Sequence, residues 1–358
     1  MTVSAPTRTP ASRARPRRTV RIGPLSGTYR RRQLAVPLLV VLALLLASAV
    51  SLGRGDFPIS VPDVLGALVG AGDDTQRLIV LELRAPRIVV AVLVGIALGV
   101  SGALIQTFAR NPLASPDVLG VTGGAAIGAV AVIVLGGTAA GGLGLPAAAL
   151  LGGLLMSLLI FGLAWRSGID GYRLVLVGVG LSAMAQAVVS YLLTRSAIQD
   201  AAAANVWITG SLNGRGWDQA RPLAVALIVL LPAALAMNRA LGVLQFGDET
   251  ARALGVRVPL AQAAVVVVAV GLAAFAVSAA GPIQFVALVV PQIAVRLAGG
   301  SRPPLLTSGL LGALLVVASD LLARTVLPAS FPVGVVTAIV GAPYLLWLLV
   351  RGRRRSTL

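Results

Sequence analysis

Most of this chain consists of apolar runs of roughly 20 residues, the length that a helix needs to cross the hydrocarbon core of a membrane. Turns rich in Gly, Pro and Arg separate the runs. Charged residues make up only 11% of the 358 residues, whereas about 25% of a soluble domain is charged. The sequence therefore predicts an all-α, polytopic membrane helix bundle, a transmembrane domain of about ten helices over residues 33–350. The candidate spans are 33–52, 87–107, 118–136, 146–164, 174–193, 222–238, 260–280, 284–298, 305–323 and 333–350.

Much of the net charge of +17 lies at the two ends of the chain. Nine arginines and no acidic residue fall within residues 1–32, and four arginines fall within residues 351–358. Because basic residues are retained on the cytoplasmic side, both termini are expected in the cytoplasm and the number of spans is even. We expect 1–32 to be a disordered basic tail and 351–358 a second basic tail. The charge in these tails is typical of a membrane protein and predicts no nucleic-acid partner.

The connecting loops support this count of spans. Alternation from a cytoplasmic start places four Arg-containing loops inside, namely 108–117, 165–173, 239–259 and 299–304. The loops expected outside are 53–86, 137–145, 194–221, 281–283 and 324–332. The first of these outside loops breaks the rule, since it carries Arg54, Arg77 and Arg84 and ends beside Arg87.

The Lys-free composition, rich in Ala, Val, Gly and Arg, indicates a bacterial chain, and we expect it in the plasma (inner) membrane.

Missing residue types exclude several kinds of chemistry. The chain has no Cys and no His, which argues against haem ligation, zinc sites and His-based catalysis. It has no Lys and no G-x-x-x-x-G-K-[ST] motif, so it cannot bind ATP in the P-loop manner. No cofactor and no catalytic residue are expected. An ion-coupled secondary transporter is an alternative, but it needs ionisable residues within spans, and Asp320 is almost the only candidate.

Small residues recur at helical spacing in two of the spans. Gly95, Gly99 and Gly102 form one set, and Gly120, Gly124 and Gly128 form the other. Such faces let helix backbones approach closely in lipid, which favours tight packing within the bundle. A pore-lining face that slides or opens is the alternative interpretation.

The inside loop 239–259 predicts a short amphipathic helix. Gly247 ends one segment, Asp248 can cap the next helix with its charge at the positive end, and Leu254 and Gly255 close it. A short helix on the cytoplasmic face of a transporter is typical of a docking element. An ordinary loop helix is the alternative.

This segment and several others resemble a known family. GDETARALGV at 247–256 is similar to the coupling segment of iron-siderophore and cobalamin ABC-importer permeases, and the ferric-enterobactin type is the nearest in character. Further matching stretches occur in the right order and cover nearly the whole chain after residue 33. They are LRAPR at 83–87, SGALIQ at 101–106, RNPLASPDVLGVTGGAAIG at 110–128, GPIQFVALVVPQIAVRL at 281–297, ASDLLAR at 318–324 and FPVGVVTAIVGAPYLLWLL at 331–349. One departure is Gln292, where the family usually has His.

The resemblance implies a type II ABC importer permease architecture. Two permease subunits, identical copies or paralogues, surround the path, and two cytoplasmic ATPase subunits bind ATP and Mg²⁺. An extracytoplasmic binding protein delivers the ferric siderophore, with a catecholate or mixed type favoured over hydroxamate, cobalamin and haem. The coupling loop then transmits the ATPase motion. The residues that the resemblance places in the ATPase contact are Gly247, Asp248, Glu249, Thr250, Ala251, Arg252, Ala253, Leu254 and Gly255.

The resemblance also gives the outward arginines a role. Arg84, Arg87 and Arg324 match family arginines that meet acidic side chains of the binding protein, and guanidinium groups suit such carboxylates. Two other interpretations remain open from the residues alone. The arginines can extend to lipid headgroups, or Arg324 can pair with Asp320 one helical turn earlier.

Two further sets of residues are implied more weakly. The loop 205–217 is similar to ferric-catecholate members, which makes Trp207, Asn213 and Trp217 candidates for contact with the chelate. The alternative for the tryptophans is a belt at the membrane interface. For the translocation path and its gate, the resemblance points to Asn111, Pro112, Thr122, Gly123 and Gly124.

Overall fold

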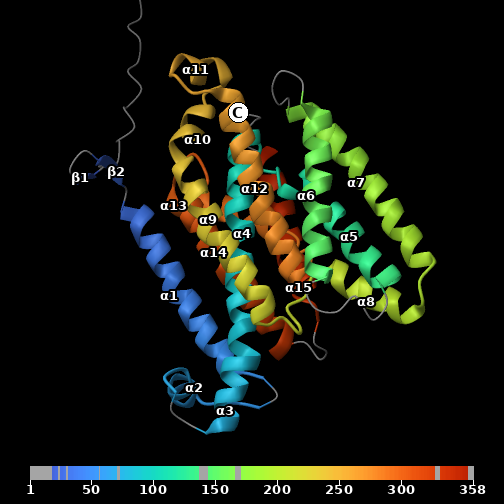
Figure 1. Cartoon of the computed structure of the whole chain (residues 1–358). Helices are drawn as coiled ribbons and strands as arrows, with labels where there is room; N and C mark the ends of the chain where they lie inside the picture. The colour runs from blue at the N-terminus through green and yellow to red at the C-terminus, as the bar shows by residue number, and fades with distance from the viewer. Residues whose placement is uncertain are drawn as a thin grey trace, which may run out of the picture.

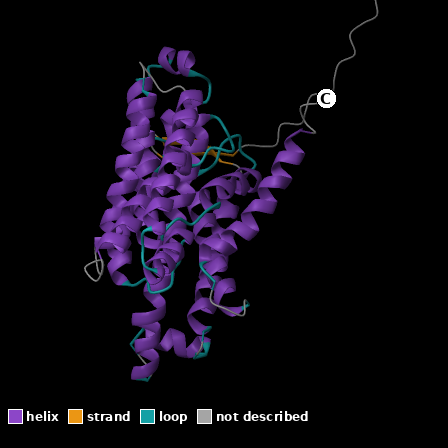
Figure 2. Ribbon diagram, turned by 90° about the vertical axis from the view of Figure 1, so that its right-hand side faces the viewer, coloured by secondary structure: helices purple, strands orange, loops and turns teal. Residues whose placement is uncertain are grey.

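The protein forms a bundle of helices that run along a common axis, with one short β-hairpin beside it (Figures 1 and 2). The computed structural model describes residues 18–22, 25–29, 31–55, 57–70, 73–136, 144–165, 171–326 and 331–353. Strands β1 (Arg18–Ile22) and β2 (Leu25–Tyr29) pair in antiparallel fashion. The tail that we expected to be disordered therefore has regular backbone over these ten residues. Of the predicted tails, residues 31–32 belong to α1 and residues 351–353 to α15, whereas 1–17, 23–24, 30 and 354–358 lie outside the described residues.

Each of the ten predicted spans corresponds to a helix. Seven helical runs are long and apolar enough to cross a membrane, and three shorter apolar helices account for the remaining predictions. The seven long runs contain α1 (Arg31–Gly53), α4 (Ala85–Ala109), α6 (Gly144–Ala164), α7 (Gly171–Thr194), α9 (Trp217–Ala236), α12 (Val258–Ala280) and α14 (Leu305–Thr325). The shorter ones are α5 (Val121–Gly136), α13 (Val286–Ala298) and the apolar part Val333–Leu348 of α15 (Val333–Arg353), which continues three residues into the predicted C-terminal tail.

The predicted outside loop 53–86 is largely helical instead. It contains α2 (Val61–Leu68), α3 (Asp74–Leu78) and the π-helical turn η1 (Ile79–Arg84). The last two continue into α4, so that one helical run extends from Asp74 to Ala109. The span predicted from the sequence starts at Arg87, directly after Pro86. The wider π-turn directly before Pro86 accommodates the ring at the first turn of α4, where its missing N–H costs little.

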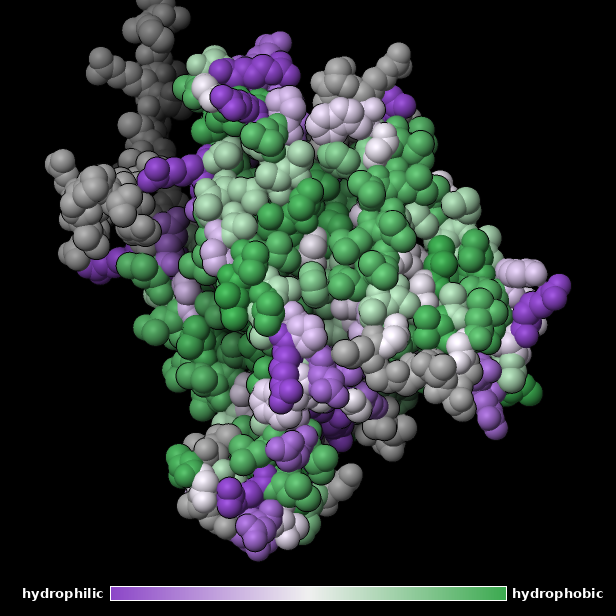
Figure 3. Space-filling model, viewed as in Figure 1, coloured by the Kyte–Doolittle hydropathy of each residue, from purple (hydrophilic) through white to green (hydrophobic). Residues whose placement is uncertain are grey.

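Helices α4 and α12 form the centre of the bundle. In an apolar stretch of 18 residues, 78% of the residues are buried in the helical run that contains α4 and 72% in α12. The corresponding share in α1 is 17%. Helix α4 packs against α14, α12, α13 and α9, and α5 packs against α6. The exposed face of α1 carries leucines, including Leu38, Leu39 and Leu45. Apolar side chains cover the middle of the molecule, while hydrophilic ones gather at the ends marked by α11 and by α2 and α3 (Figure 3).

The glycine repeats serve close helix packing. Gly95 and Gly99 lie against the backbone of α14, and Gly102 lies against Ala287 of α13. In the same way, Gly124 faces Gly152 of α6. An added Cβ at any of these positions would overlap backbone atoms of the neighbouring helix. This arrangement is the tight packing that the spacing of the small residues predicted.

The two ends of the bundle gather different loops. We call them the α11 end and the α2 end, after α11 (Asp248–Ala253) and α2 (Figure 1). At the α11 end, three loops expected on the same side of the membrane meet, because Arg110 contacts Asp248 and Arg302 donates a hydrogen bond to the Asn238 carbonyl at 2.7 Å. At the α2 end, Arg324 donates to the carbonyl oxygen of Arg54 at 3.4 Å. The contacts thus group these loops in the way that alternate crossing of a membrane requires.

Candidate functional site

The segment 239–259 folds as two short helices joined by a glycine turn. Helix α10 (Asn238–Leu244) leads to Gly247, whose φ of 101° is accessible mainly to glycine, and α11 follows at Asp248. Gly255, with a φ of 82°, lies directly after the end of α11. The predicted helix is therefore present, with the predicted boundaries. Its start differs in one respect, since no side chain caps it and the Asp248 carboxylate binds elsewhere.

Helix α11 is anchored by an apolar contact and exposes its other side. Ala251 is fully buried in a small cluster with Leu244 and Val258. Phe246 and Leu254 flank the helix and are 74% and 64% exposed. Among the residues implied in the ATPase contact, the exposed ones are Glu249, Thr250, Arg252, Ala253, Leu254 and Gly255. This end of the bundle thus presents a small surface of mixed apolar and charged side chains.

The Asp248 carboxylate is held by two side chains from other parts of the chain. Arg110, the residue that ends α4, places Nη2 at 2.7 Å from Asp248 Oδ1. Gln262 of α12 donates from Nε2 to Asp248 Oδ2 at 3.2 Å. Sequence reasoning missed this contact. The available signal was the presence of both Arg110 and Asp248 in loops that were expected on the same side.

After Arg110 the chain makes a tight turn toward the interior. The side chain of Asn111 accepts a hydrogen bond from the backbone N–H of Leu113 at 2.9 Å, and its carbonyl accepts one from Ala114. Asn111 and Pro112 are exposed at the α11 end. Of the residues implied in the path, these two therefore shape the turn, and neither lines the interior pocket described next.

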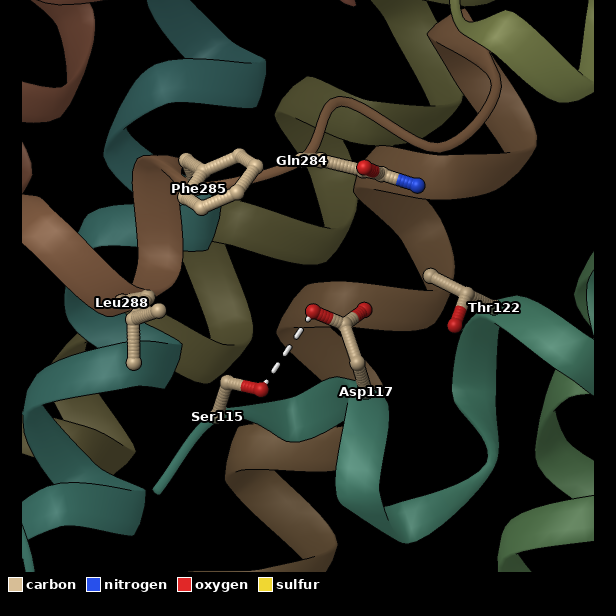
Figure 4. A pocket seen from close by; sticks show the side chains of 6 residues that line it. All are labelled: Ser115, Asp117, Thr122, Gln284, Phe285 and Leu288. Carbon is tan, nitrogen blue, oxygen red and sulfur yellow. Dashed lines mark hydrogen bonds between the residues drawn. The ribbon is translucent and has the colours of Figure 1, made fainter. Parts of the chain in front are cut away.

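An interior pocket of about 210 Å³ lies beyond this turn (Figure 4). Its lining comes from the 3₁₀ turn η2 (Pro116–Leu119) and from the starts of α5 and α13, and consists of Ser115, Asp117, Thr122, Gln284, Phe285 and Leu288. Thr122 is the one predicted path residue among them. Gly123 lies near Ala185 of α7, and Gly124 packs on α6.

Asp117 supplies the charge of this pocket. It lies in the connection between two spans, where Ser115 Oγ donates a hydrogen bond to Asp117 Oδ2 at 3.3 Å. Burial raises the pKa of the Asp117 carboxyl above its ordinary value, and hydrogen bonds from Thr122 and Ser115 oppose that rise. Phe285 borders the pocket with a φ of 66°, a left-handed conformation that is uncommon for a bulky residue. Neither Asp117 nor Phe285 was among the site residues predicted from the sequence.

Two glutamines join α4 and α13 close to the pocket. Gln106 donates from Nε2 to the carbonyl of Leu288 at 2.8 Å and accepts from Gln292 Nε2 at 2.6 Å. Gln292 is the residue at which the chain departs from the resemblance. Its side chain contacts the neutral amide of Gln106, which is buried.

The three arginines implied in docking all make internal bonds at the α2 end. Arg87 binds Asp320 through Nη2 at 2.6 Å and through Nε at 3.1 Å, and Arg324 Nε binds the other carboxylate oxygen at 3.1 Å. Arg324 also donates to Ser51 Oγ at 2.6 Å. Arg84 donates to the carbonyls of Leu52 and Phe57 at 2.7 and 2.6 Å. Helices α1, α4 and α14 are joined by this cluster, in which Arg87 and Arg324 share the Asp320 carboxylate.

The residues implied in chelate contact do not share one surface. Trp207 of α8 (Ile198–Thr209) is only 4% exposed and belongs to the core. Trp217 begins α9 and packs against the same core, whereas Asn213 is exposed in the turn between the two helices. Among the described residues, no group of three His, Cys, Asp or Glu side chains is placed to hold a metal ion.

Known proteins resemble the chain over nearly its whole length. The ferric enterobactin transport system permease protein FepG of Escherichia coli (strain K12) is 42% identical over 327 residues, covering 91% of this chain and 98% of that protein. The achromobactin transport system permease protein CbrC of Dickeya dadantii (strain 3937) is 40% identical, covering 90% and 92%.

A solved structure shares the fold. It is described as an inward-facing conformation of a metal-chelate type ABC transporter, and it matches with a TM-score of 0.79 and 29% identity over 89% of this chain and 99% of that one. The architecture is thus that of a type II ABC importer permease. The sequence model of the FecCD transport family matches residues 41–351, and this chain is a member of that family.

Proposed function

We propose that this chain is the membrane permease of an ABC importer that takes up a ferric siderophore of the catecholate or mixed type. Two such permease subunits, identical or paralogous, would enclose the path, and two ATPase subunits would bind ATP and Mg²⁺. An extracytoplasmic binding protein would deliver the chelate. Family membership and the printed functions of the relatives support the cargo class. With positive residues inside, the α11 end would face the cytoplasm, as would both termini.

The observation that carries this proposal is the exposed helix α11. A chain without a P-loop needs a partner that hydrolyses ATP, and a rigid surface through which the partner acts. Helix α11 offers such a surface because buried Ala251 anchors it, while Phe246 and Leu254 are exposed beside charged Glu249 and Arg252. The bundle itself performs no covalent chemistry in this scheme and only opens or closes a path.

The arginine cluster at the α2 end suits the opposite partner. Its guanidinium groups would attract acidic side chains of a binding protein. The guanidinium groups of Arg87 and Arg324 are already bonded to Asp320, so docking would add to their internal bonds. In this scheme the cluster both steers the binding protein and holds α1, α4 and α14 together.

The ATPase contact predicts a large effect of charge on the exposed apolar residues of this surface. In the double variant Phe246→Asp with Leu254→Asp, we expect the ATPase subunit to be lost on co-purification and iron uptake to stop. The matched control is Ile198→Asp, an exposed residue of α8 outside this surface, 89% exposed, which should leave co-purification unchanged. If the double variant retains the ATPase subunit, α11 is not the contact.

The cargo is tested in cells that lack this chain and have no redundant uptake system. Radiolabelled iron is presented as a catecholate, a hydroxamate and a citrate chelate, and labelled cobalamin is the fourth probe. Loss of catecholate uptake alone supports the proposed cargo class. Normal uptake of all three iron chelates together with loss of cobalamin uptake would contradict it.

A further inference from the structure

Arg110 has an unusual backbone conformation for its residue type. With a φ of 51° it ends α4 in the left-handed region, and Phe285 is the other non-glycine residue with positive φ in the described part of the chain. This position at a helix end normally favours glycine, because a Cβ is strained there. A long charged side chain at such a position indicates that its own contacts hold the conformation.

Those contacts join three separate elements at the α11 end. Arg110 closes α4, Asp248 is the first residue of α11, and Gln262 belongs to the first turns of α12. The side chains of Arg110 and Asp248 are 47% and 33% exposed, so the ion pair by itself contributes little to stability. The ion pair instead fixes the position of the turn after α4 relative to α11. No other ion pair links that turn to α11 in the described part of the chain.

The same turn leads directly to the interior pocket. Asn111 ties the turn through Leu113 and Ala114, and the chain then reaches Ser115 and Asp117, two of the pocket residues. A displacement of α11 that pulls on Asp248 would therefore move Arg110 and, through a short and internally bonded turn, one wall of the pocket.

We propose that the Arg110–Asp248 ion pair transmits the displacement of α11 to the turn 110–117 and thereby to the pocket. Both are positioning residues, and Asp248 serves this internal link instead of the ATPase contact. The inference rests on the proposed function, in which ATPase subunits move α11. It assigns the ATPase contact to Phe246, Leu254 and their exposed neighbours, and the transmission to Asp248.

The decisive variant is Arg110→Gly, because glycine adopts the observed φ without strain, while loss of the side chain removes the ion pair. The assembled complex with its ATPase and binding protein is reconstituted in vesicles, with ferric enterobactin as probe. We expect ATPase subunits to remain bound and ATP to be hydrolysed, while chelate transported per ATP falls by about tenfold, a typical size for coupling between sites. Arg257→Gly is the control, since Arg257 is exposed in the same inside loop and forms no ion pair among the described residues.

A charge exchange separates transmission from direct contact. Asp248→Arg alone should uncouple transport, and Arg110→Asp combined with Asp248→Arg should recover most of it, because aspartate tolerates the left-handed conformation. If Asp248→Arg releases the ATPase subunit and the exchange does not restore binding, Asp248 contacts the ATPase and the proposal is wrong. Unchanged transport per ATP in Arg110→Gly would overturn it equally.

A second readout does not depend on the cargo. The chain has no Cys, so single cysteines at Leu113 and Ala253, both exposed, can carry spin labels. We expect their separation to stay constant when nucleotide binds to the ATPase subunits, and to change with nucleotide in Arg110→Gly. A separation that changes equally in both proteins contradicts the proposal. Failure of every chelate in the parent complex would instead contradict the proposed cargo, and the spin-label result would stand.

Discussion

Asp320→Asn is expected to lower the free energy of unfolding by about 3–5 kcal/mol, the usual effect of removing one partner from a buried ion pair. The Asp320 side chain is 2% exposed, and those of Arg87 and Arg324 are 18% and 15% exposed. Neutralising the carboxylate removes from both guanidinium groups the negative charge of Asp320 in a poorly hydrated site. The decrease in the free energy of unfolding then exceeds the decrease caused by removing one partner of a surface ion pair, because water cannot replace the missing partner.

The effect should extend beyond the ion pairs themselves. Arg324 also binds Ser51 and the carbonyl of Arg54, at the end of α1. When Asp320 no longer orients Arg324, these bonds weaken and the end of α1 loosens from α14. We therefore expect proteolysis to begin near residues 51–60 in the variant.

The measurement is chemical unfolding of the purified protein in mixed micelles. The control is Asp74→Asn, in which the lost partner of Arg77 is a fully exposed carboxylate at 3.7 Å. We expect no measurable change there, since exposed pairs of this kind contribute little. An Asp320→Asn protein as stable as the parent would show that the cluster is not a structural element.

Gly99→Ala should destabilise the bundle by about 1–3 kcal/mol or more, although alanine is the better helix former. Gly99 lies on α4 against the Ser308 carbonyl of α14, and an added Cβ would overlap that oxygen. The overlap is with backbone, so no side chain can rotate to relieve it. The two helices must therefore move apart at this contact.

Gly162→Ala is the matched control for this substitution. Gly162 lies in α6, and nothing is within 4 Å of an added Cβ there. Its thermal unfolding in the same micelles should be unchanged or slightly shifted upward, because alanine reduces the freedom of the unfolded chain. Equal stability of Gly99→Ala and the parent would mean that α4 and α14 are not in close contact in the membrane.

Much of the fold was predictable from the sequence because its causes are local. A helix in lipid satisfies its backbone hydrogen bonds within its own segment, so a long apolar run is sufficient to predict a span. The same holds for α11, where Gly247 and Gly255 end the short segment at the predicted residues. The π-turn before Pro86 was missed, because its wider geometry has no clear sequence signal.

The candidate site was predictable only in part. Thr122, predicted for the translocation path, lines the pocket, and the assignment to the path stays a prediction. Asp117 lies in the same segment of the chain, whereas Gln284 and Phe285 come from a segment more than 160 residues further along. Trp207 was a candidate for chelate contact, yet it belongs to the core, since a tryptophan near a predicted loop gives no sign of which way it faces.

The sequence by itself determined the membrane class of the chain, its ten apolar helices and the position of α11, since hydrophobic length and glycine turns act over neighbouring residues. Only the tertiary structure decided that Asp320 joins Arg87 to Arg324, and that Asp248 binds Arg110. The partners Arg110 and Asp248 are 138 residues apart, and each faces several possible partners of opposite charge. Which pair forms depends on the close packing of the helices, because that packing brings one carboxylate within reach of one guanidinium.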